Sequence, residues 1–326
     1  MSERKTFGLY QGDGTTLSAR DTKLSLYQPI GDLDDPAGYL AEKGLCDAVN
    51  VALTLGQPLL LTGEPGTGKT QLAASVAYGL DLPSPLVFHV KTTSSAKDLF
   101  YRYDSLRHFH DSQFQSEGLS VEDYITYEPF GLAILLSQEP AAANPYLPVQ
   151  FRDKGPTRSV VLIDEIDKAP RDLPNDVLNE IENMSFTVKE TGKTFTSDTS
   201  YRPILILTRN SEKHLPDAFL RRCVFYHIAF PTTDRLTQIV QLRLQPNSNF
   251  TPEMLGHAIQ HFEEIRELGL RKPPATAELL GWVKILENLE LDVSNLKPGQ
   301  VEALAFSYCV LAKTKEDLDR LRLILN

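Results

Sequence analysis

Apolar positions in the first two thirds of the chain form short continuous runs that alternate with helical patterns. Such runs, bounded by polar or glycine-containing segments, are typical of buried strands in a parallel sheet. Five runs fit this description: 59–61, 86–90, 159–163, 204–207 and 224–228. Between them, apolar or alanine-rich segments with helical spacing predict helices at 39–55, 71–80, 130–136, 172–184 and 215–223. This alternation predicts an α/β domain with a parallel sheet.

Beyond Pro231 the pattern becomes helical throughout. Prolines separate five predicted helices, at 234–244, 251–268, 276–289, 301–312 and 316–325. A length of 326 residues is compatible with two domains. The sequence therefore predicts a polar N-terminal extension over 1–28, an α/β core over 29–230 and a small all-helical domain over 231–326.

Two segments of the core have patterns of their own. Residues 186–195 alternate around a glycine-containing turn, which predicts a β-hairpin. Residues 99–110 interleave aromatic side chains with Arg and His. Such a mixture either stacks on nucleic-acid bases or packs an insertion against the core and contacts protein. Because no wider basic surface accompanies it, packing or protein contact is the favoured interpretation.

Charge and composition narrow the class of partner. The chain has 33 Lys and Arg against 43 Asp and Glu, a net charge of −10, which disfavours a general surface for nucleic acid or anionic membranes. No apolar run approaches the ~18 residues of a membrane span, and no signal-peptide core follows the N-terminus. Three scattered cysteines, Cys46, Cys223 and Cys309, have neither metal nor disulfide spacing. We therefore expect a soluble, cytoplasmic protein with no membrane partner.

The strand at 59–61 leads into a loop with the spacing Gly-x-x-x-x-Gly-Lys-Thr. Its members are Gly63, Glu64, Pro65, Gly66, Thr67, Gly68, Lys69 and Thr70. Glycines let a backbone fold around an anion with its N–H groups turned inward, and the helix that follows adds the positive end of its dipole. Lys69 would meet the β- and γ-phosphates, and the Thr70 hydroxyl would bind Mg²⁺. The loop predicts a site for a nucleoside triphosphate.

A second motif follows the buried run at 159–163, which ends in Asp164 and Glu165. The carboxyl ends of parallel strands meet at the ligand-binding edge of an open α/β sheet. We expect Asp164 to hold Mg²⁺ and Glu165 to orient or deprotonate the attacking water. Two adjacent acids alone are a weak signal, but after a phosphate-binding loop the combination is specific.

Three further residues are weaker candidates. Asn210 ends the strand at 204–207 and would reach the γ-phosphate or the attacking water, although asparagine is also a common turn residue there. Arg221 and Arg222 end the short helix at 215–223. Arginine neutralises transition-state charge on a γ-phosphate, and it also suits the negative end of a helix dipole.

In this order the motifs resemble those of the AAA+ ATPases, and within them the MoxR-like branch. The loop at 63–70 is similar to the Walker A motif, 161–170 to Walker B and Asn210 to sensor 1. The hairpin at 186–196 resembles the pre-sensor-1 hairpin, and 99–110 falls where the branch inserts a hairpin into helix 2.

The resemblance implies a P-loop NTPase αβα sandwich with a small C-terminal helical lid, and hydrolysis of ATP with Mg²⁺. It further implies a ring of this chain, with six subunits as the expected number, in which Arg222 acts on the neighbouring subunit's nucleotide and Arg221 is the second choice. The implied role is chaperone-like remodelling or assembly of a protein complex.

Some residues depart from the family pattern. Cys223 stands where relatives have an aromatic residue, and either Arg271 or Lys272 would have to serve as the sensor-2 cation. Two other functions remain open. One is a nucleotide-dependent switch or scaffold for a partner effector; the other is a nucleic-acid motor partnered with a nuclease, as in McrB-like proteins, against which the acidic charge weighs.

Overall fold

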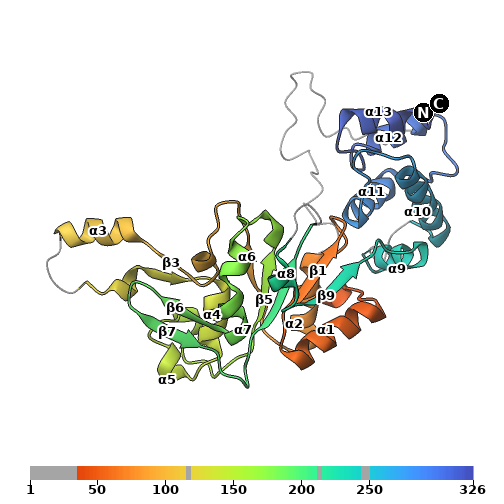
Figure 1. The fold of residues 1–326 in the computed structure, drawn as a ribbon. Helices are drawn as coiled ribbons and strands as arrows, with labels where there is room; N and C mark the ends of the chain where they lie inside the picture. Colours follow the sequence, from red (N-terminus) through yellow and green to blue (C-terminus); the bar gives the residue numbers. More distant parts are fainter. Residues whose placement is uncertain (1–34, 115–118, 211–214, 244–249, 326) are drawn as a thin grey trace. The chain divides into compact units, whose positions relative to one another are not determined.

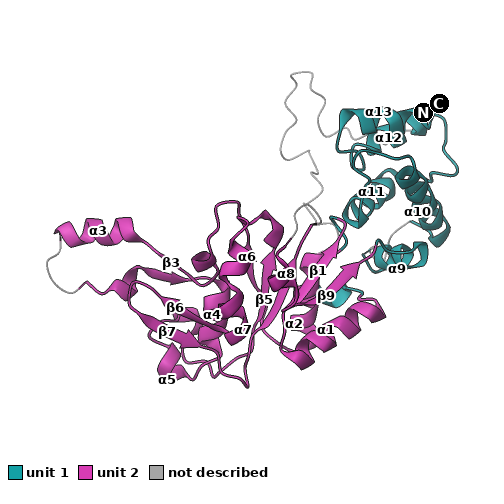
Figure 2. Cartoon of the chain, in the orientation of Figure 1, with its two compact units in different colours: residues 1–40, 65–67, 230–326 teal, residues 41–64, 68–229 magenta. Residues whose placement is uncertain are grey.

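The computed structural model describes residues 35–114, 119–210, 215–243 and 250–325, so the predicted extension over 1–28 lies outside the described residues. The chain divides into two compact units (Figure 2). The larger contains residues 41–64 and 68–229. The other is built on residues from 230 onward and also includes 35–40 and 65–67.

The larger unit is organised around a five-stranded parallel sheet (Figure 1). Its strands are those predicted: β1 Leu59–Gly63, β2 Leu86–His89, β5 Val160–Asp164, β8 Ile204–Thr208 and β9 Val224–Ile228. Their order across the sheet is β2-β5-β8-β1-β9, and each neighbouring pair is parallel. The three inner strands are almost wholly buried, whereas the edge strands β2 and β9 are partly exposed, which is why the inner strands give the strongest apolar runs.

Helices flank this sheet and complete the predicted α/β sandwich. α1 (Lys43–Leu55) packs on β9 and β1, α2 (Lys69–Gly79) on β1, β5 and β8, and α4 (Pro129–Leu136) on β2 and β5. Shorter helices are α5 (Pro140–Ala143), α6 (Leu173–Asp176), α7 (Leu178–Asn183) and α8 (Asp217–Leu220).

Three predicted helices of this unit differ from the observed ones, and the one expected over 215–223 is the shorter α8, Asp217–Leu220. The helix expected over 39–55 begins only at Lys43, because Tyr39 and Glu42 have extended backbone angles. The helix expected over 172–184 is two helices, α6 and α7, because Val177 leaves the α conformation at φ −102° and ψ 3°.

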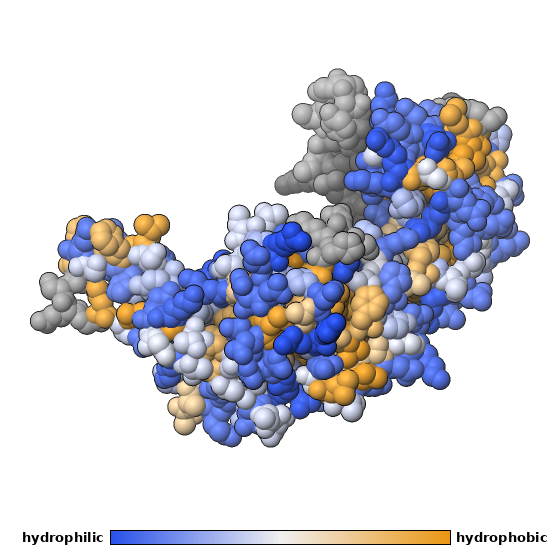
Figure 3. All heavy atoms as spheres, viewed as in Figure 1, coloured by the Kyte–Doolittle hydropathy of each residue, from blue (hydrophilic) through white to orange (hydrophobic). Residues whose placement is uncertain are grey.

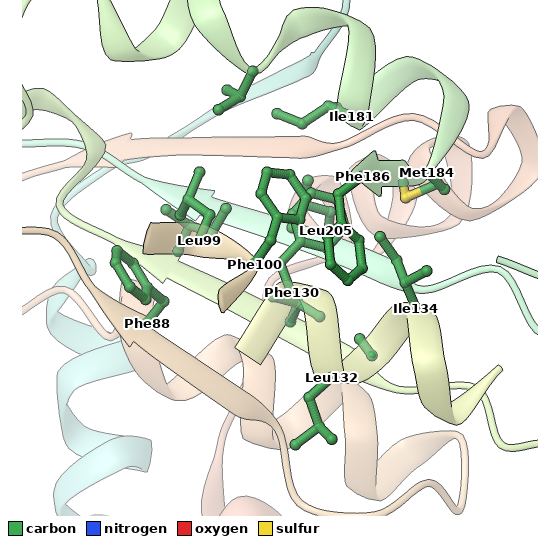
Figure 4. Close-up of a cluster of buried hydrophobic side chains, with 14 of the residues drawn as sticks. Phe88, Leu99, Phe100, Phe130, Leu132, Ile134, Ile181, Met184, Phe186 and Leu205 are labelled. Atoms are coloured by element: carbon green, nitrogen blue, oxygen red, sulfur yellow. The ribbon is translucent and has the colours of Figure 1, made fainter. Parts of the chain in front are cut away.

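Two antiparallel pairs of strands extend this unit and share an aromatic cluster. β3 (Tyr101–Tyr103) pairs with β4 (Ile125–Tyr127), and α3 (Ser105–Phe114) lies between them in the chain. β6 (Ser185–Val188) and β7 (Lys193–Thr196) form the predicted hairpin. Phe100 stacks on Phe186 at 5.2 Å between ring centroids and lies 4.9 Å from Phe130 (Figure 4).

The two pairs are also joined by hydrogen bonds. The Tyr101 hydroxyl accepts from the Lys189 backbone N–H at 2.9 Å and donates to the Glu190 carboxylate at 2.8 Å. Phe100 and Tyr101 are therefore packing residues, as favoured for segment 99–110, whereas α3 contains no buried residue.

The second unit contains five helices at the predicted positions, although the helix expected over 301–312 ends at Ser307. They are α9 Thr233–Arg243, α10 Pro252–Glu267, α11 Thr276–Leu289, α12 Gln300–Ser307 and α13 Lys315–Leu323. Its core surrounds Phe262 and Trp282, and the Trp282 indole N–H donates to the buried Ser307 hydroxyl at 2.8 Å. Within the described ranges, no helix is both long and apolar enough to cross a membrane.

His261 makes the stability of this unit depend on pH. Its ring lies beside those of Trp282 and Tyr308, its Nε2 is 2.6 Å from the Tyr308 hydroxyl, and Glu264 is 3.6 Å from its Nδ1. Burial outweighs the nearby Glu264 and lowers the pKa of His261. At acidic pH the unfolded chain therefore binds a proton at His261 more readily than the folded unit does. The free energy of unfolding keeps its full value above about pH 6.5 and decreases as the pH falls below it.

Chemical unfolding of the full chain at pH 7.5, 6 and 5 should show this decrease in the free energy of unfolding. The decrease should be smaller in the His261→Gln variant. An equal decrease in that variant would contradict the assignment to His261.

Candidate active site

The predicted site residues come from three neighbouring strands of the parallel sheet. The loop at 63–70 follows β1, Asp164 ends β5, and Asn210 lies two residues beyond β8. β8 lies between β1 and β5, with Leu61 opposite Thr208 and Ile163 opposite Leu207. The carboxyl ends of these strands therefore place the predicted side chains at one edge of the sheet.

The loop has the backbone that its glycines allow. Gly66 and Gly68 have φ of 77° and 85°, which is left-handed backbone that residues with a Cβ adopt only at a cost. α2 begins at Lys69, so the first N–H groups of an eleven-residue helix lie directly after the loop. Both features suit an anion bound by backbone N–H groups.

Lys69 is the buried cation of this loop. Its side chain is almost inaccessible to solvent, and its ammonium group donates to the Gly63 carbonyl at 2.9 Å and the Glu64 carbonyl at 2.8 Å. Burial lowers the pKa of Lys69, while Asp164 and other nearby acids oppose that change. Both of these hydrogen-bond partners are neutral carbonyls, not carboxylates.

The two predicted metal ligands, Asp164 and Thr70, are hydrogen-bonded to each other. Asp164 Oδ1 accepts from the Thr208 hydroxyl at 2.6 Å and from the Thr70 hydroxyl at 3.2 Å, and Asp164 Oδ2 lies 3.4 Å from His89 Nδ1. A carboxylate and a hydroxyl are hard oxygen donors that suit Mg²⁺. Among the described residues there is no cluster of three His, Cys, Asp or Glu side chains that would hold a metal alone. The two oxygen donors, Thr70 and Asp164, fit Mg²⁺ whose other ligands would be phosphate oxygens and water.

Glu165 lies beside Asn210. The Asn210 side-chain amide donates to Glu165 Oε1 at 3.0 Å, and Lys168 pairs with Oε2, a hydrogen bond that raises the pKa of Lys168. The Glu165 backbone is left-handed, with φ 59° and ψ 51°, and its N–H donates to the Thr208 hydroxyl at 2.8 Å. A non-glycine residue in this conformation is locally strained, a state that proteins retain at functional sites.

Four further residues at this site were not predicted from the sequence. Thr208 bridges Asp164 and Glu165, Lys168 pairs with Glu165, and buried Asp167 accepts from the Asn210 backbone N–H at 3.2 Å. His89 contacts Asp164 because it lies opposite that residue in the register of β2 and β5. Strand order and register are the signals that would have revealed Thr208 and His89.

The arginine pair lies at the end of α8. Arg222 donates from Nε to Glu182 at 3.1 Å and from Nη1 to the Ala218 carbonyl at 3.0 Å. Arg221 is exposed, and its backbone N–H donates to Asp217 at 3.0 Å. Within the part of the chain that the structure describes, neither guanidinium group bonds to the loop, Asp164 or Glu165.

The two sensor-2 candidates lie in the helical unit. The backbone N–H groups of Arg271 and Lys272 donate to the buried Asp317 carboxylate at 2.9 and 3.3 Å. The Arg271 guanidinium lies 3.8 Å from Glu316, with both side chains exposed. Asp317 therefore fixes the backbone of both candidates and leaves the choice between them open.

Comparison with known protein families gives a match. Residues 58–223, just over half of the chain, match the family model of the AAA domain, dynein-related subfamily. No curated protein matches the chain. The matched range contains the phosphate loop, both acids, Asn210 and the arginine pair.

Proposed function

The chain belongs to the AAA domain family, in its dynein-related subfamily, and we propose that it hydrolyses ATP to remodel or assemble a protein complex, as a MoxR-like chaperone. The observation that best supports hydrolysis is the continuous set of hydrogen bonds from Thr70 through Asp164 and Thr208 to Glu165, with Asn210 on the carboxylate of Glu165. This set joins the proposed metal ligands to the proposed water-activating acid.

Each group has a distinct part in the proposed reaction. Lys69 exchanges its two carbonyl partners for the β- and γ-phosphates. Thr70 and Asp164 hold Mg²⁺, which when bound offsets the charge of the phosphates. Glu165 accepts a proton from the attacking water, or orients it, and Asn210 fixes the position of the Glu165 carboxylate.

In the proposed reaction, the positive charge that completes each site comes from Arg222 of a neighbouring subunit. In its own subunit its described partners are Glu182 and Ala218, and part of its guanidinium faces solvent. We place it, with Arg221 as second choice, at the nucleotide of the next subunit in a ring of six. Hydrolysis would then require assembly.

We place the contact with the protein client on α3. One side of this helix packs on the insertion: His108 stacks on Tyr124 at 4.5 Å between ring centroids, and Asp111 accepts from the Tyr124 hydroxyl. Leu106 and Phe109 lie on the other side of the helix, and they and Phe114, its last residue, are exposed by 81%, 63% and 74%. Figure 3 shows apolar surface on α3. Through β3, the insertion that carries α3 is bonded to the β6–β7 hairpin, which links the client surface to the body of the α/β unit.

The experiment that tests this role holds the protein in its ATP state and asks what it binds. Glu165→Gln should retain a protein client in a pull-down with ATP, and adding Phe109→Ser should lower retention at least about tenfold, because a buried aromatic anchor carries much of an interface's energy. Phe109→Ser alone should keep basal ATP turnover but lose stimulation by the client. Val149→Ser, which changes another exposed apolar residue, is the matched control.

Other outcomes would change the proposed function. Stimulation of turnover by DNA would favour the nucleic-acid motor. A client that binds with ATP but leaves turnover unchanged would favour the switch or scaffold. If the Glu165→Gln variant retains as much client with Phe109→Ser as without it, α3 is not the client surface.

A further inference from the structure

Glu182 fixes one edge of the Arg222 guanidinium. Arg222 donates from Nε to Glu182 Oε2 at 3.1 Å and from Nη1 to the Ala218 carbonyl at 3.0 Å. Two acceptors on different helices, α7 and α8, restrict both the position and the plane of the group. The Arg222 side chain is still 41% exposed, so its remaining N–H donors can meet a ligand from outside the subunit.

Neither packing nor helix stability explains Glu182. Its side chain is 61% exposed, so it fills no core position. It is the second-last residue of α7, where a negative charge opposes the helix dipole. Its ionic partner in the described part of the chain is Arg222.

The backbone that carries Glu182 is itself anchored. The Arg202 guanidinium donates to the Glu182 carbonyl at 3.1 Å and to the Gly56 carbonyl, just after α1, at 3.2 Å. A cation between two helix C-termini is favoured by both dipoles. Because Arg202 lies two residues before β8, its hydrogen bond attaches the end of α7 to the segment that leads into the central sheet.

We propose that Glu182 is a positioning residue for ATP hydrolysis, which holds the Arg222 guanidinium in the orientation that the neighbouring subunit's nucleotide requires. This inference rests on the proposed function, in which Arg222 acts on that nucleotide. Without Glu182 the arginine side chain regains its rotamer freedom, and the productive orientation becomes less populated.

The expected effect is moderate and confined to turnover. An exposed ion pair contributes little, so Glu182→Ala in the full assembled chain should lower kcat about fivefold. KM for ATP and the melting temperature should not change. Glu182→Asp, which keeps the charge, should recover part of kcat. Asp176→Ala, which removes an exposed charge from α6, should leave kcat unchanged.

A double-mutant comparison tests whether Glu182 acts through Arg222. Adding Glu182→Ala to an Arg222→Ala variant should cause no further loss of kcat, because no guanidinium group remains to be positioned. An unchanged or raised kcat in Glu182→Ala alone, or the same fivefold loss in the Arg222→Ala background, would overturn the proposal. Full kcat in Arg222→Ala alone would instead refute the role of Arg222, and with it this inference, so the two failures are distinguishable.

Discussion

Replacing Glu165 with glutamine is expected to lower the rate of ATP hydrolysis about 10²–10⁴-fold while ATP still binds. The amide has nearly the same size and can still contact Asn210, but it cannot accept a proton from water. The phosphate-binding groups, Lys69 and the start of α2, are unchanged. Steady-state phosphate release measures the first effect, and equilibrium binding of a fluorescent ATP analogue measures the second.

The control for this variant is Asp172→Asn, which neutralises an exposed acid at the start of α6. It should keep both turnover and binding. Full turnover in Glu165→Gln would mean that another group activates the water, and a loss of binding would mean that Glu165 is needed to maintain the loop.

Replacing Arg222 with alanine is expected to lower kcat about 10³-fold, the lower end of the effect of an arginine finger. Binding of ATP by the same subunit should not change, because the described partners of Arg222 are Glu182 and Ala218 and not the loop. Phosphate release and ATP binding, measured at a protein concentration that maintains the assembly, separate the two effects.

Arg221→Ala is the matched control, since it removes the same charge from the adjacent position. Its turnover should remain within about threefold of that of the unchanged chain, because Arg221 is exposed and forms no ion pair with another described residue. If Arg221→Ala shows the large loss and Arg222→Ala does not, Arg221 is the acting residue.

The sequence predicts the sheet and the central motifs because each depends on a local pattern. The inner strands are buried on both faces and are therefore continuous apolar runs. The loop at 63–70 and the acids at 164 and 165 adjoin two of these runs, so their place at the carboxyl edge follows from the strands alone.

The remaining parts of the site depend on the order of the strands, which a local pattern does not contain. Thr208 bridges Asp164 and Glu165 only because β8 lies next to β5, and His89 reaches Asp164 only because β2 lies on the other side. The left-handed backbone of Glu165 is likewise imposed by its surroundings, since glutamate has no preference for it. The pairing of Arg222 with Glu182 joins the turn after α8 to α7, and the break between α6 and α7 was not predicted.

The most direct test of a site shared between subunits is to mix two inactive variants. Arg222→Ala subunits keep Glu165, and Glu165→Gln subunits keep Arg222. In a randomly mixed ring of equal parts, about one quarter of the sites combine the two intact residues, so about a quarter of the original ATP turnover should return if sites act independently. If the mixture instead shows only the average of the two separate variants, Arg222 does not complete the site of a neighbouring subunit.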